Sequence, residues 1–476
     1  MPSLDSPTLS LESTVVPMAE TPAQQSRTVS IAGDDRIEKK DGSLSGEGSV
    51  NVKETGGDLE QPAGEATFPE GGLRAWLVVI GVVISQMCSF GYTNAYGVYN
   101  DYYVRYYLAK NYTSGQISWI GSVQLGLVLS SGLVSGRAFD RGYFYHLMIG
   151  GSILLVFCLF MLSITQPEKL YQVFLLQGIG MGIAIGLMYI PALGIISQYF
   201  LKRRSLALGI GTAGSALGGM LHPIMLNKWF HGSLGFHNGV RASAGLIGGL
   251  LLISIILMKP RPQAFAARKQ NSDPGLLKNF RTFLSDIPYT ITVFGTICVL
   301  SGLYFPIYFI QLNSIKNGIN PDLAFYTIAI LNGSSIIGRI VPNIFIYRFG
   351  AFNVLVPCTA VSAILVFCTL AVNNAVGTIF YSVLFGFFSG AYVGTLPPAI
   401  TSLAHSDSEI GSRLGICFTF TGIGGLIGTP IAGLLLTSDF HWWRPIVFAG
   451  VCVSTGFLSF TCTRFLKARE RGTHRV

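Results

Sequence analysis

Charged residues are scarce in this chain of 476 residues. They make up 12% of the sequence, against about a quarter in ordinary soluble domains, while 50% of the residues are hydrophobic and the mean hydropathy is +0.52. This composition excludes an ordinary soluble protein and indicates membrane-spanning segments. The net charge of +9 does not indicate nucleic-acid binding, because the cations lie between apolar runs and not in one solvated patch.

Patterns typical of metal sites and enzymes are also missing. All 8 cysteines lie inside apolar runs, and no pair has metal-ligand or C-x-x-C spacing, so we expect neither a disulfide framework nor a metal site. The glycine-rich run 178–182 is similar to a dinucleotide loop, but it has no preceding strand and no acidic residue about 20 positions later. We find no phosphate-loop or nucleophile-elbow pattern. We therefore expect no enzyme and no cofactor.

The first 69 residues have no apolar periodicity and are rich in Ser, Thr, Gly, Pro and acidic residues. Residues 1–70 hold 5 Lys/Arg against 13 Asp/Glu. Such a segment does not bury enough apolar surface to order itself, so residues 1–69 are predicted to be a disordered acidic cytosolic tail. No basic stretch followed by an apolar core is present, and we therefore expect no signal peptide.

Twelve apolar segments follow, each long enough for the roughly 20 helical residues that cross a bilayer. We predict an all-α integral membrane protein with twelve transmembrane helices in two six-helix bundles, residues 70–258 and 287–466. A cytosolic linker, 259–286, joins the bundles, and 467–476 form a short cytosolic tail. The expected spans are 74–99, 115–136, 144–164, 170–199, 204–226, 239–258, 287–312, 322–346, 353–373, 377–403, 411–437 and 443–465.

The distribution of cations predicts the orientation. With the N-terminus in the cytosol, the cytoplasmic loops and ends after residue 70 carry 19 Lys/Arg and the opposite side carries 7. This bias follows the positive-inside rule. We expect a multi-pass protein, in the plasma membrane, with both termini cytosolic. The sequon Asn111-Tyr112-Thr113 then lies outside, which makes Asn111 a candidate for glycosylation.

Two motifs stand at the entries of expected helices. The first is Glu70–Trp76, EGGLRAW, and the second is Tyr199–Gly219, YFLKRRSLALGIGTAGSALGG, in which three cations precede a run of small residues. They resemble the signatures of the monocarboxylate porter family, a branch of the major facilitator superfamily, and the spacing of the first is closer to fungal members. Small residues let helix backbones approach closely in lipid. The resemblance implies the major facilitator fold and secondary transport by alternating access through a cavity between the halves.

A third motif is a candidate gate. The loop Gly136–Gly142, GRAFDRG, resembles the loop shared across the superfamily between helices 2 and 3. An aspartate at a helix end can pair with a cation or a helix N-terminus and hold one gated state. We assign gating to Asp140 and Arg141, and to Arg203 in the turn before helix 5. A simple tight turn is the alternative for the loop.

Arg339 is the only charge well inside any expected helix. Because a charged side chain costs free energy in the hydrocarbon core, we expect it to face protein or water. Asn332 and Ser335 share its helical face at spacings i, i+3, i+7. A guanidinium beside neutral donors suits a carboxylate or another anionic group. An interhelical arginine that never meets substrate is the alternative. The resemblance favours substrate binding, because the family's substrate arginine falls at this point of the eighth expected helix.

Two departures from the family argue against the usual proton coupling. Asn94 stands where proton-coupled members have a lysine in helix 1, and Ser335 stands where they have an aspartate. No Asp or Glu lies deep in an expected helix. His222 is the one buried group expected to titrate near neutrality, and we take it as a possible proton site, with a packing histidine as the alternative.

Aromatic and amide side chains favour a cargo larger than a small monocarboxylate. Tyr304 in helix 7, Tyr392 in helix 10 and Asn94 suit an apolar pocket with a few orienting donors, unless the tyrosines only pack between helices. We expect efflux or facilitated diffusion of a small organic-acid-like or amphipathic metabolite. The expected partner is therefore a small-molecule substrate of anionic or amphipathic character. The alternatives are uptake of a monocarboxylate or vitamin-like nutrient and a non-transporting nutrient sensor.

Overall fold

The structure is a computed structural model that describes residues 70–261, 276–406, 409–436 and 441–476. For 276–280 it describes the backbone course only. The expected tail, 1–69, and residues 262–275 of the expected linker lie outside the described residues. All regular elements in the described ranges are helical.

Residues 70–261 form the first half. Its helices are α1 (Gly72–Cys88), α2 (Phe90–Thr93), α3 (Tyr96–Tyr102), the π-helical η1 (Tyr103–Tyr107), α4 (Ser114–Ser130), α5 (Gly132–Asp140), α6 (Phe144–Leu162), α7 (Leu170–Val173), the π-helical η2 (Phe174–Gly180), α8 (Met181–Gly194), the 3-10 turn η3 (Ile195–Gln198), α9 (Arg204–His231) and α10 (Gly235–Leu257).

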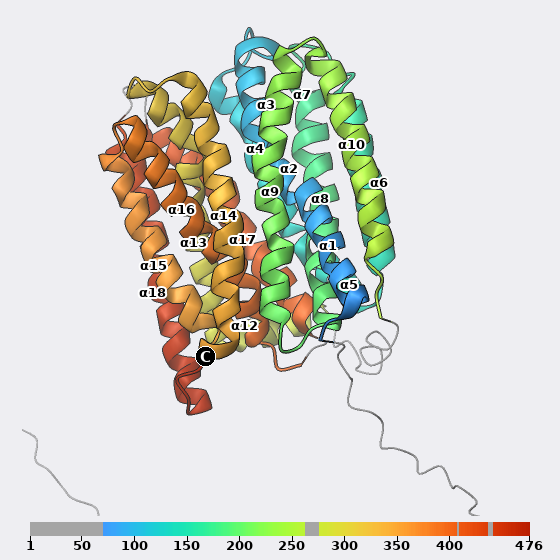
Figure 1. Ribbon diagram of the computed structural model, residues 1–476, viewed down its shortest axis with the longest axis vertical. Helices are drawn as coiled ribbons and strands as arrows, with labels where there is room; N and C mark the ends of the chain where they lie inside the picture. The colour runs from blue at the N-terminus through green and yellow to red at the C-terminus, as the bar shows by residue number, and fades with distance from the viewer. Residues whose placement is uncertain (1–69, 262–275, 407–408, 437–440) are drawn as a thin grey trace, which may run out of the picture. The chain divides into compact units, whose positions relative to one another are not determined.

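The second half begins with a helix inside the expected linker. Its elements are α12 (Leu276–Ser285), α13 (Ile287–Lys316), α14 (Pro321–Phe349), α15 (Ala351–Cys368), the 3-10 turn η4 (Thr369–Ala371), α16 (Ala375–Ser402), α17 (Ile410–Leu436) and α18 (Trp443–Arg471). We call the end of the helices that holds α12 and the C-terminus the α12 end (Figure 1).

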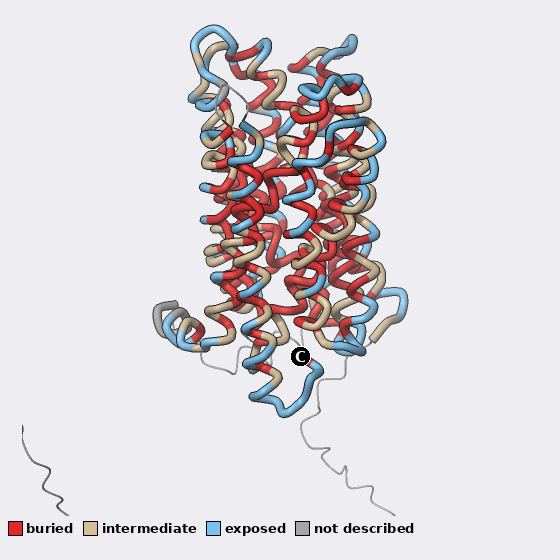
Figure 2. The backbone as a smooth tube through the Cα atoms, turned by 90° about the vertical axis from the view of Figure 1, so that its left-hand side faces the viewer, coloured by how far each residue is buried: buried red, intermediate tan, exposed pale blue. Residues whose placement is uncertain are grey.

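Eleven helical segments of the described chain are long and apolar enough to cross a membrane. The twelfth expected span is α9, which has 28 residues and therefore sufficient length, but its glycines, serines and threonines lower its hydropathy. Buried and exposed residues alternate along most of the long helices (Figure 2). The all-α membrane architecture predicted from the apolar segments is thus confirmed, with α9 distinguished by its small residues.

Close backbone approaches explain the glycines of α9. A Cβ at Gly214 would collide with the carbonyl oxygen of Val83, and one at Gly218 with that of Met87, so α1 and α9 pack backbone to backbone. α9 also packs against α14, and α4 and α5 pack against α17. The two halves therefore meet along α9–α14 and along α4/α5–α17.

Several helices run past the limits expected for the membrane spans, the first and the last among them. The first span does not end at residue 99 but continues to Tyr107, because η1 extends the helix by more than a turn beyond Tyr102. The last helix runs to Arg471, beyond the expected boundary at 466. The first difference matters for function, since it brings further polar residues into the wall of a cavity.

Candidate functional site

The first span is broken halfway along its length. α1 ends at Cys88, the short helix α2 follows, and Asn94 and Ala95 separate α2 from α3. Interrupted helices at mid-membrane depth are typical of transporter binding sites, because the break presents polar groups to a cavity. Asn94 is partly exposed at this break and lines three separate cavities.

The smallest of these cavities brings together five of the six residues predicted to bind substrate. It has a volume of about 20 Å³ and lies between α2, α13, α14 and α16. The predicted residues that line it are Asn94, Tyr304, Asn332, Ser335 and Arg339. The face of α14 that carries Asn332, Ser335 and Arg339 was predicted from their spacing alone, and it points at the break in the first span.

Arg339 is almost completely buried, with 5% of its surface exposed, and its donors bridge the two halves. Nη1 donates to the carbonyl oxygen of Thr212 at 2.7 Å and to the hydroxyl of Ser215, both on α9. Nε donates to Ser335 Oγ at 3.3 Å, one turn earlier on α14. Arg339 thus joins the second half to the small-residue helix of the first half.

Glycines allow this arginine to approach both neighbouring helices. A Cβ at Gly209 of α9 would lie 2.5 Å from the Arg339 carbonyl oxygen, and one at Gly394 of α16 would lie 2.8 Å from its Cα. A Cβ at Gly390 would lie 2.5 Å from Ser335 Oγ. Larger residues at these positions would push α14 away from α9 and α16 and remove the guanidinium from its partners.

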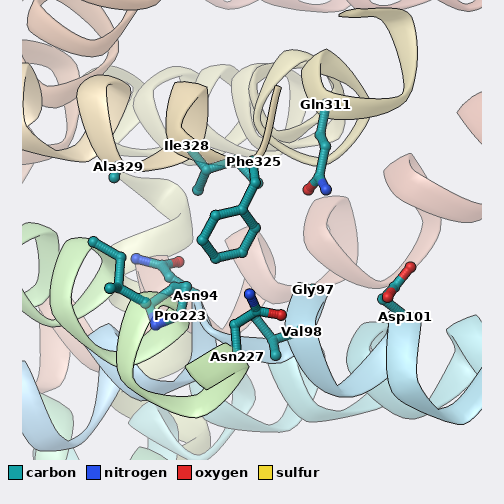
Figure 3. A pocket seen from close by; sticks show the side chains of 11 residues that line it. Asn94, Gly97, Val98, Asp101, Pro223, Asn227, Gln311, Phe325, Ile328 and Ala329 are labelled. Carbon is teal, nitrogen blue, oxygen red and sulfur yellow. The ribbon is translucent and has the colours of Figure 1, made fainter. Parts of the chain in front are cut away.

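Two larger cavities extend from Asn94 away from the α12 end. One has a volume of about 340 Å³ and is walled by α3, η1, α4 and the last turns of α13. The other, about 70 Å³, lies between α3, α9 and α14. Phe325 and Gln311 of the second half project there towards Asn94 and Asn227 of the first half (Figure 3). The space between the halves is therefore hollow on the side opposite to the α12 end.

Asp101 is a site residue that sequence reasoning missed. It lies on α3, lines both larger cavities, and forms an ion pair with Arg105 Nε at 2.7 Å. Its side chain is 43% exposed. The expected end of the first span at residue 99 placed Asp101 in a loop, whereas the helical segment that begins at Gly72 continues through it to Tyr107. A prediction of the helical continuation through the tyrosine-rich run 99–107 would have found it.

Two predicted site residues lie outside these cavities. Tyr392 is 1% exposed, and its ring stacks on Phe460 of α18 with centroids 6.1 Å apart. His222 is buried between α9 and α1, where its Nε2 lies 3.2 Å from the carbonyl oxygen of Met87 and its ring packs edge-on against Tyr92. Neither side chain therefore lines the three cavities around Asn94.

The predicted gating aspartate joins the two halves at the α12 end. The carboxylate of Asp140 accepts hydrogen bonds from the backbone N–H of Ser412 at 2.8 Å and from its hydroxyl at 2.9 Å. Ser412 lies in the first turn of α17, where orphan N–H groups and the helix dipole favour an anion. A Cβ at Gly411 would collide with the carboxylate. Arg141 and Arg203, the other predicted gating residues, are exposed beside α5 and α9.

The two signature motifs meet in space. The Glu70 carboxylate accepts hydrogen bonds from the backbone N–H groups of Leu201 at 2.9 Å, Lys202 at 2.6 Å and Arg203 at 3.3 Å. Partial burial acts to raise the pKa of this carboxyl group, but these donors outweigh it and hold the pKa below the ordinary value. Trp76 packs edge-on against Phe200 at 5.4 Å. The first motif thus caps the segment that leads into α9.

A further ionic cluster lies within the second half at the α12 end. Arg413, 3% exposed at its side chain, pairs with Asp286 at 2.8 Å and with Glu409 at 3.1 Å. Its Nη2 lies 2.9 Å from His405 Nδ1, and its guanidinium stacks 4.7 Å from the ring of Phe283 on α12. The cluster ties α12, α13 and α17 together, a contact between distant segments that no sequence spacing indicated.

The sequon at Asn111 lies in the exposed loop between η1 and α4. Its backbone N–H donates to the Glu168 carboxylate at 3.2 Å, and Thr113 caps α4 through a reciprocal pair of hydrogen bonds with Gln116. Glycosylation of Asn111 remains a prediction.

Comparison with protein families places the fold. The family model of the Major Facilitator Superfamily matches residues 78–403. The crystal structure of the Escherichia coli fucose:proton symporter is similar over 81% of this chain and 99% of its own, with a TM-score of 0.60 and 14% identity. That likeness concerns the fold alone.

Relatives with higher identity are fungal transport proteins. The aspyridones efflux protein of Emericella nidulans is 37% identical over 83% of this chain and 78% of its own. The agnestins efflux protein of Paecilomyces divaricatus is 34% identical over 82% of this chain and 86% of its own.

Proposed function

This chain belongs to the Major Facilitator Superfamily of membrane transporters, and we propose that it exports a small amphipathic metabolite that carries an anionic group. Export is favoured over nutrient uptake because the two relatives described above are named efflux proteins. An amphipathic cargo is favoured because the larger cavity, about 340 Å³, falls within the range of pockets that bury drug-sized ligands and has an aromatic and amide lining.

The single observation that carries the proposal is the position of Arg339. It is the buried cation at the floor of the space between the halves, with Asn94, Tyr304 and Asn332 around it. A guanidinium in such a setting offers bidentate hydrogen bonds to a carboxylate or a related anion. We assign anion recognition to Arg339 and orientation of the cargo to the neighbouring amides and tyrosine.

The same arginine connects binding with alternating access. Its bonds to α9 and the bonds of Asp140 to Ser412 hold the halves together towards the α12 end. We take this end as cytoplasmic from the distribution of Lys and Arg, with both termini in the cytosol and the protein in the plasma membrane. The conformation described is then outward-facing. An anion that competes with Thr212 and Ser215 for the guanidinium would weaken one of these two contacts.

We further propose that the chain lies in the monocarboxylate porter branch of the superfamily. The support is the contact between Glu70 and the segment before α9, which gives both signature motifs one shared structural role. The two bundles are assigned to 70–258 and 287–466, with the ionic cluster around Arg413 anchoring the end of the linker. Asn94 and Ser335 stand in place of the lysine and aspartate of proton-coupled members, which favours transport without proton coupling.

The proposal is tested by flux of labelled aromatic and aliphatic carboxylates in proteoliposomes, with and without an imposed pH gradient. Each acid is matched with its neutral methyl ester as the control substrate. We expect movement of an amphipathic acid, slower movement of its ester, and no dependence on the gradient. Equal transport of acid and ester would overturn the role of Arg339 in recognition. Flux driven by the pH gradient would indicate proton coupling, with His222 or Asp101 as the proton-carrying residue.

A further inference from the structure

We propose that a groove between α9 and α14 at the α12 end binds the headgroup of an anionic phospholipid. The groove has a volume of about 270 Å³. It is separate from the cavities around Arg339, with which it shares no lining residue. One wall, from α9 and the turn before it, belongs to the first half, and the other wall, from α14, belongs to the second half. The lining residues are Lys202, Arg203, Ser205, Leu206, Asn343, Ile344 and Tyr347.

Two cations give the groove its charge. Lys202 and Arg203 are exposed, and neither forms a salt bridge with a carboxylate of the described residues. The Glu70 carboxylate accepts hydrogen bonds from the backbone N–H groups of this segment, and the charge of Lys202 nearby also lowers its pKa. With one carboxylate beside two exposed cations, the groove keeps a net positive charge that suits a phosphate. Basic pockets between transmembrane helices on the cytoplasmic side are suited to anionic headgroups.

A buried amide lies at the inner wall of the groove. Asn343 is 1% exposed, and its Nδ2 donates to the Arg339 carbonyl oxygen at 2.7 Å. Its Oδ1 has no hydrogen-bond partner in the described chain. Leaving a buried acceptor unsatisfied costs free energy. Asn343 thus adds a polar side chain to the inner wall of the groove, while Lys202 and Arg203 are placed to hold the phosphate of a headgroup such as that of phosphatidylinositol.

The surface beside the groove suits an acyl chain and so distinguishes a lipid from a soluble anion. Ile344, at the groove, is 53% exposed, and Ile337, seven residues earlier on the same face of α14, is 55% exposed. Two turns of helix separate them, about 10 Å along the axis. Cations at one end and an apolar strip running from it match the headgroup and the first part of an acyl chain.

A lipid in this groove would favour the conformation described here. Its walls come from both halves, so the site exists only while α9 and α14 are close together at the α12 end. A ligand that binds one conformation shifts the equilibrium towards it. The inferred ligand is therefore a structural lipid of the outward-facing conformation, and its binding does not depend on the identity of the transported substrate.

The test measures retention of phosphatidylinositol by the purified full-length protein in detergent, using native mass spectrometry. The double variant Lys202→Gln/Arg203→Gln is compared with the control Lys259→Gln/Arg469→Gln, which removes two exposed cations from the same end but outside the groove. We expect about a 25-fold loss of lipid affinity in the first variant, about fivefold for each cation, and little change in the control. The charge-retaining swap Lys202→Arg/Arg203→Lys should restore retention and shows that the segment tolerates substitution.

Three results would overturn the proposal. Equal retention by the parent and the Lys202→Gln/Arg203→Gln variant would remove the groove as the site. An equal loss in the control would mean that only the general charge of this end attracts the lipid. Displacement of phosphatidylinositol by inorganic phosphate at comparable concentration would reassign the groove to a soluble anion. Phosphatidylcholine, which has no net charge, serves as the reference lipid in each measurement.

Discussion

Replacing Arg339 by glutamine should change both substrate recognition and the balance between conformations. The substitution removes a charged donor from the carbonyl oxygen of Thr212 and the hydroxyl of Ser215. Hydrogen bonds to charged groups contribute about 1.5–3 kcal/mol each. Taking about 3 kcal/mol for the pair, the ratio of outward-facing to inward-facing protein should fall roughly 150-fold.

The assay combines flux with the labelling rate of a thiol placed at Asn100, which lines the larger cavity. In an Asn100→Cys background, Arg339→Gln should slow labelling by an impermeant reagent from outside and abolish transport of the acid. Ser215→Ala removes one bond and leaves the guanidinium, so it should shift labelling roughly tenfold and retain transport. Arg241→Gln, whose bonds stay within the first half, is the matched control. Full transport and unchanged labelling in Arg339→Gln would refute the reasoning.

Three further predictions follow from contacts of the described residues. Asp140→Ala removes both hydrogen bonds to the first turn of α17, so external thiol labelling should slow roughly 150-fold, as for the pair of bonds at Arg339; an unchanged rate would show that this contact does not hold the halves together. Glu70→Gln should lower the free energy of unfolding by about 1 kcal/mol at pH 7. Because the pKa of Glu70 is lowered in the folded protein, this difference in unfolding free energy should persist above about pH 4.3 and shrink as the pH falls through the folded pKa. Thermal unfolding of parent and variant in detergent measures the difference. A difference that grows in acid would contradict the assignment. Gly214→Ala should destabilise the α1–α9 contact by about 1–3 kcal/mol in the same unfolding assay, whereas Gly249→Ala, where a Cβ meets nothing within 4 Å, should not; equal stability of the two variants would argue against the backbone contact with Val83.

The helical architecture and the composition of one binding face could be predicted from local pattern. Long apolar runs indicate helices because a bilayer leaves backbone groups no partner outside the helix. Asn332, Ser335 and Arg339 share a face because helical periodicity places residues three, four and seven apart on one side. The cost of a buried guanidinium then indicates that this face meets protein or water. These inferences need only the spacing of residues along one helix.

The direction in which a face points was decided by tertiary structure. Helices of this chain are apolar nearly all round, so no amphipathic signal distinguishes a face towards the cavity from one towards another helix. Tyr392 met the same chemical criteria as Tyr304, yet it stacks on Phe460 while Tyr304 lines the cavity. The rotation of each helix about its axis depends on packing against its neighbours.

Contacts between distant segments were likewise beyond the reach of local pattern. Glu70 caps a segment 131 to 133 residues away, and Arg339 meets side chains and carbonyls 124 and 127 residues away. Asp101 enters the cavity wall because the first span breaks at Asn94 and then continues to Tyr107. The sequence by itself determined that this chain spans a membrane in helices, with one cation, Arg339, well inside an expected helix. Only the packed structure decided which groups that cation bonds, because these partners are chosen by helix rotation and close backbone approach, which depend on all the helices together.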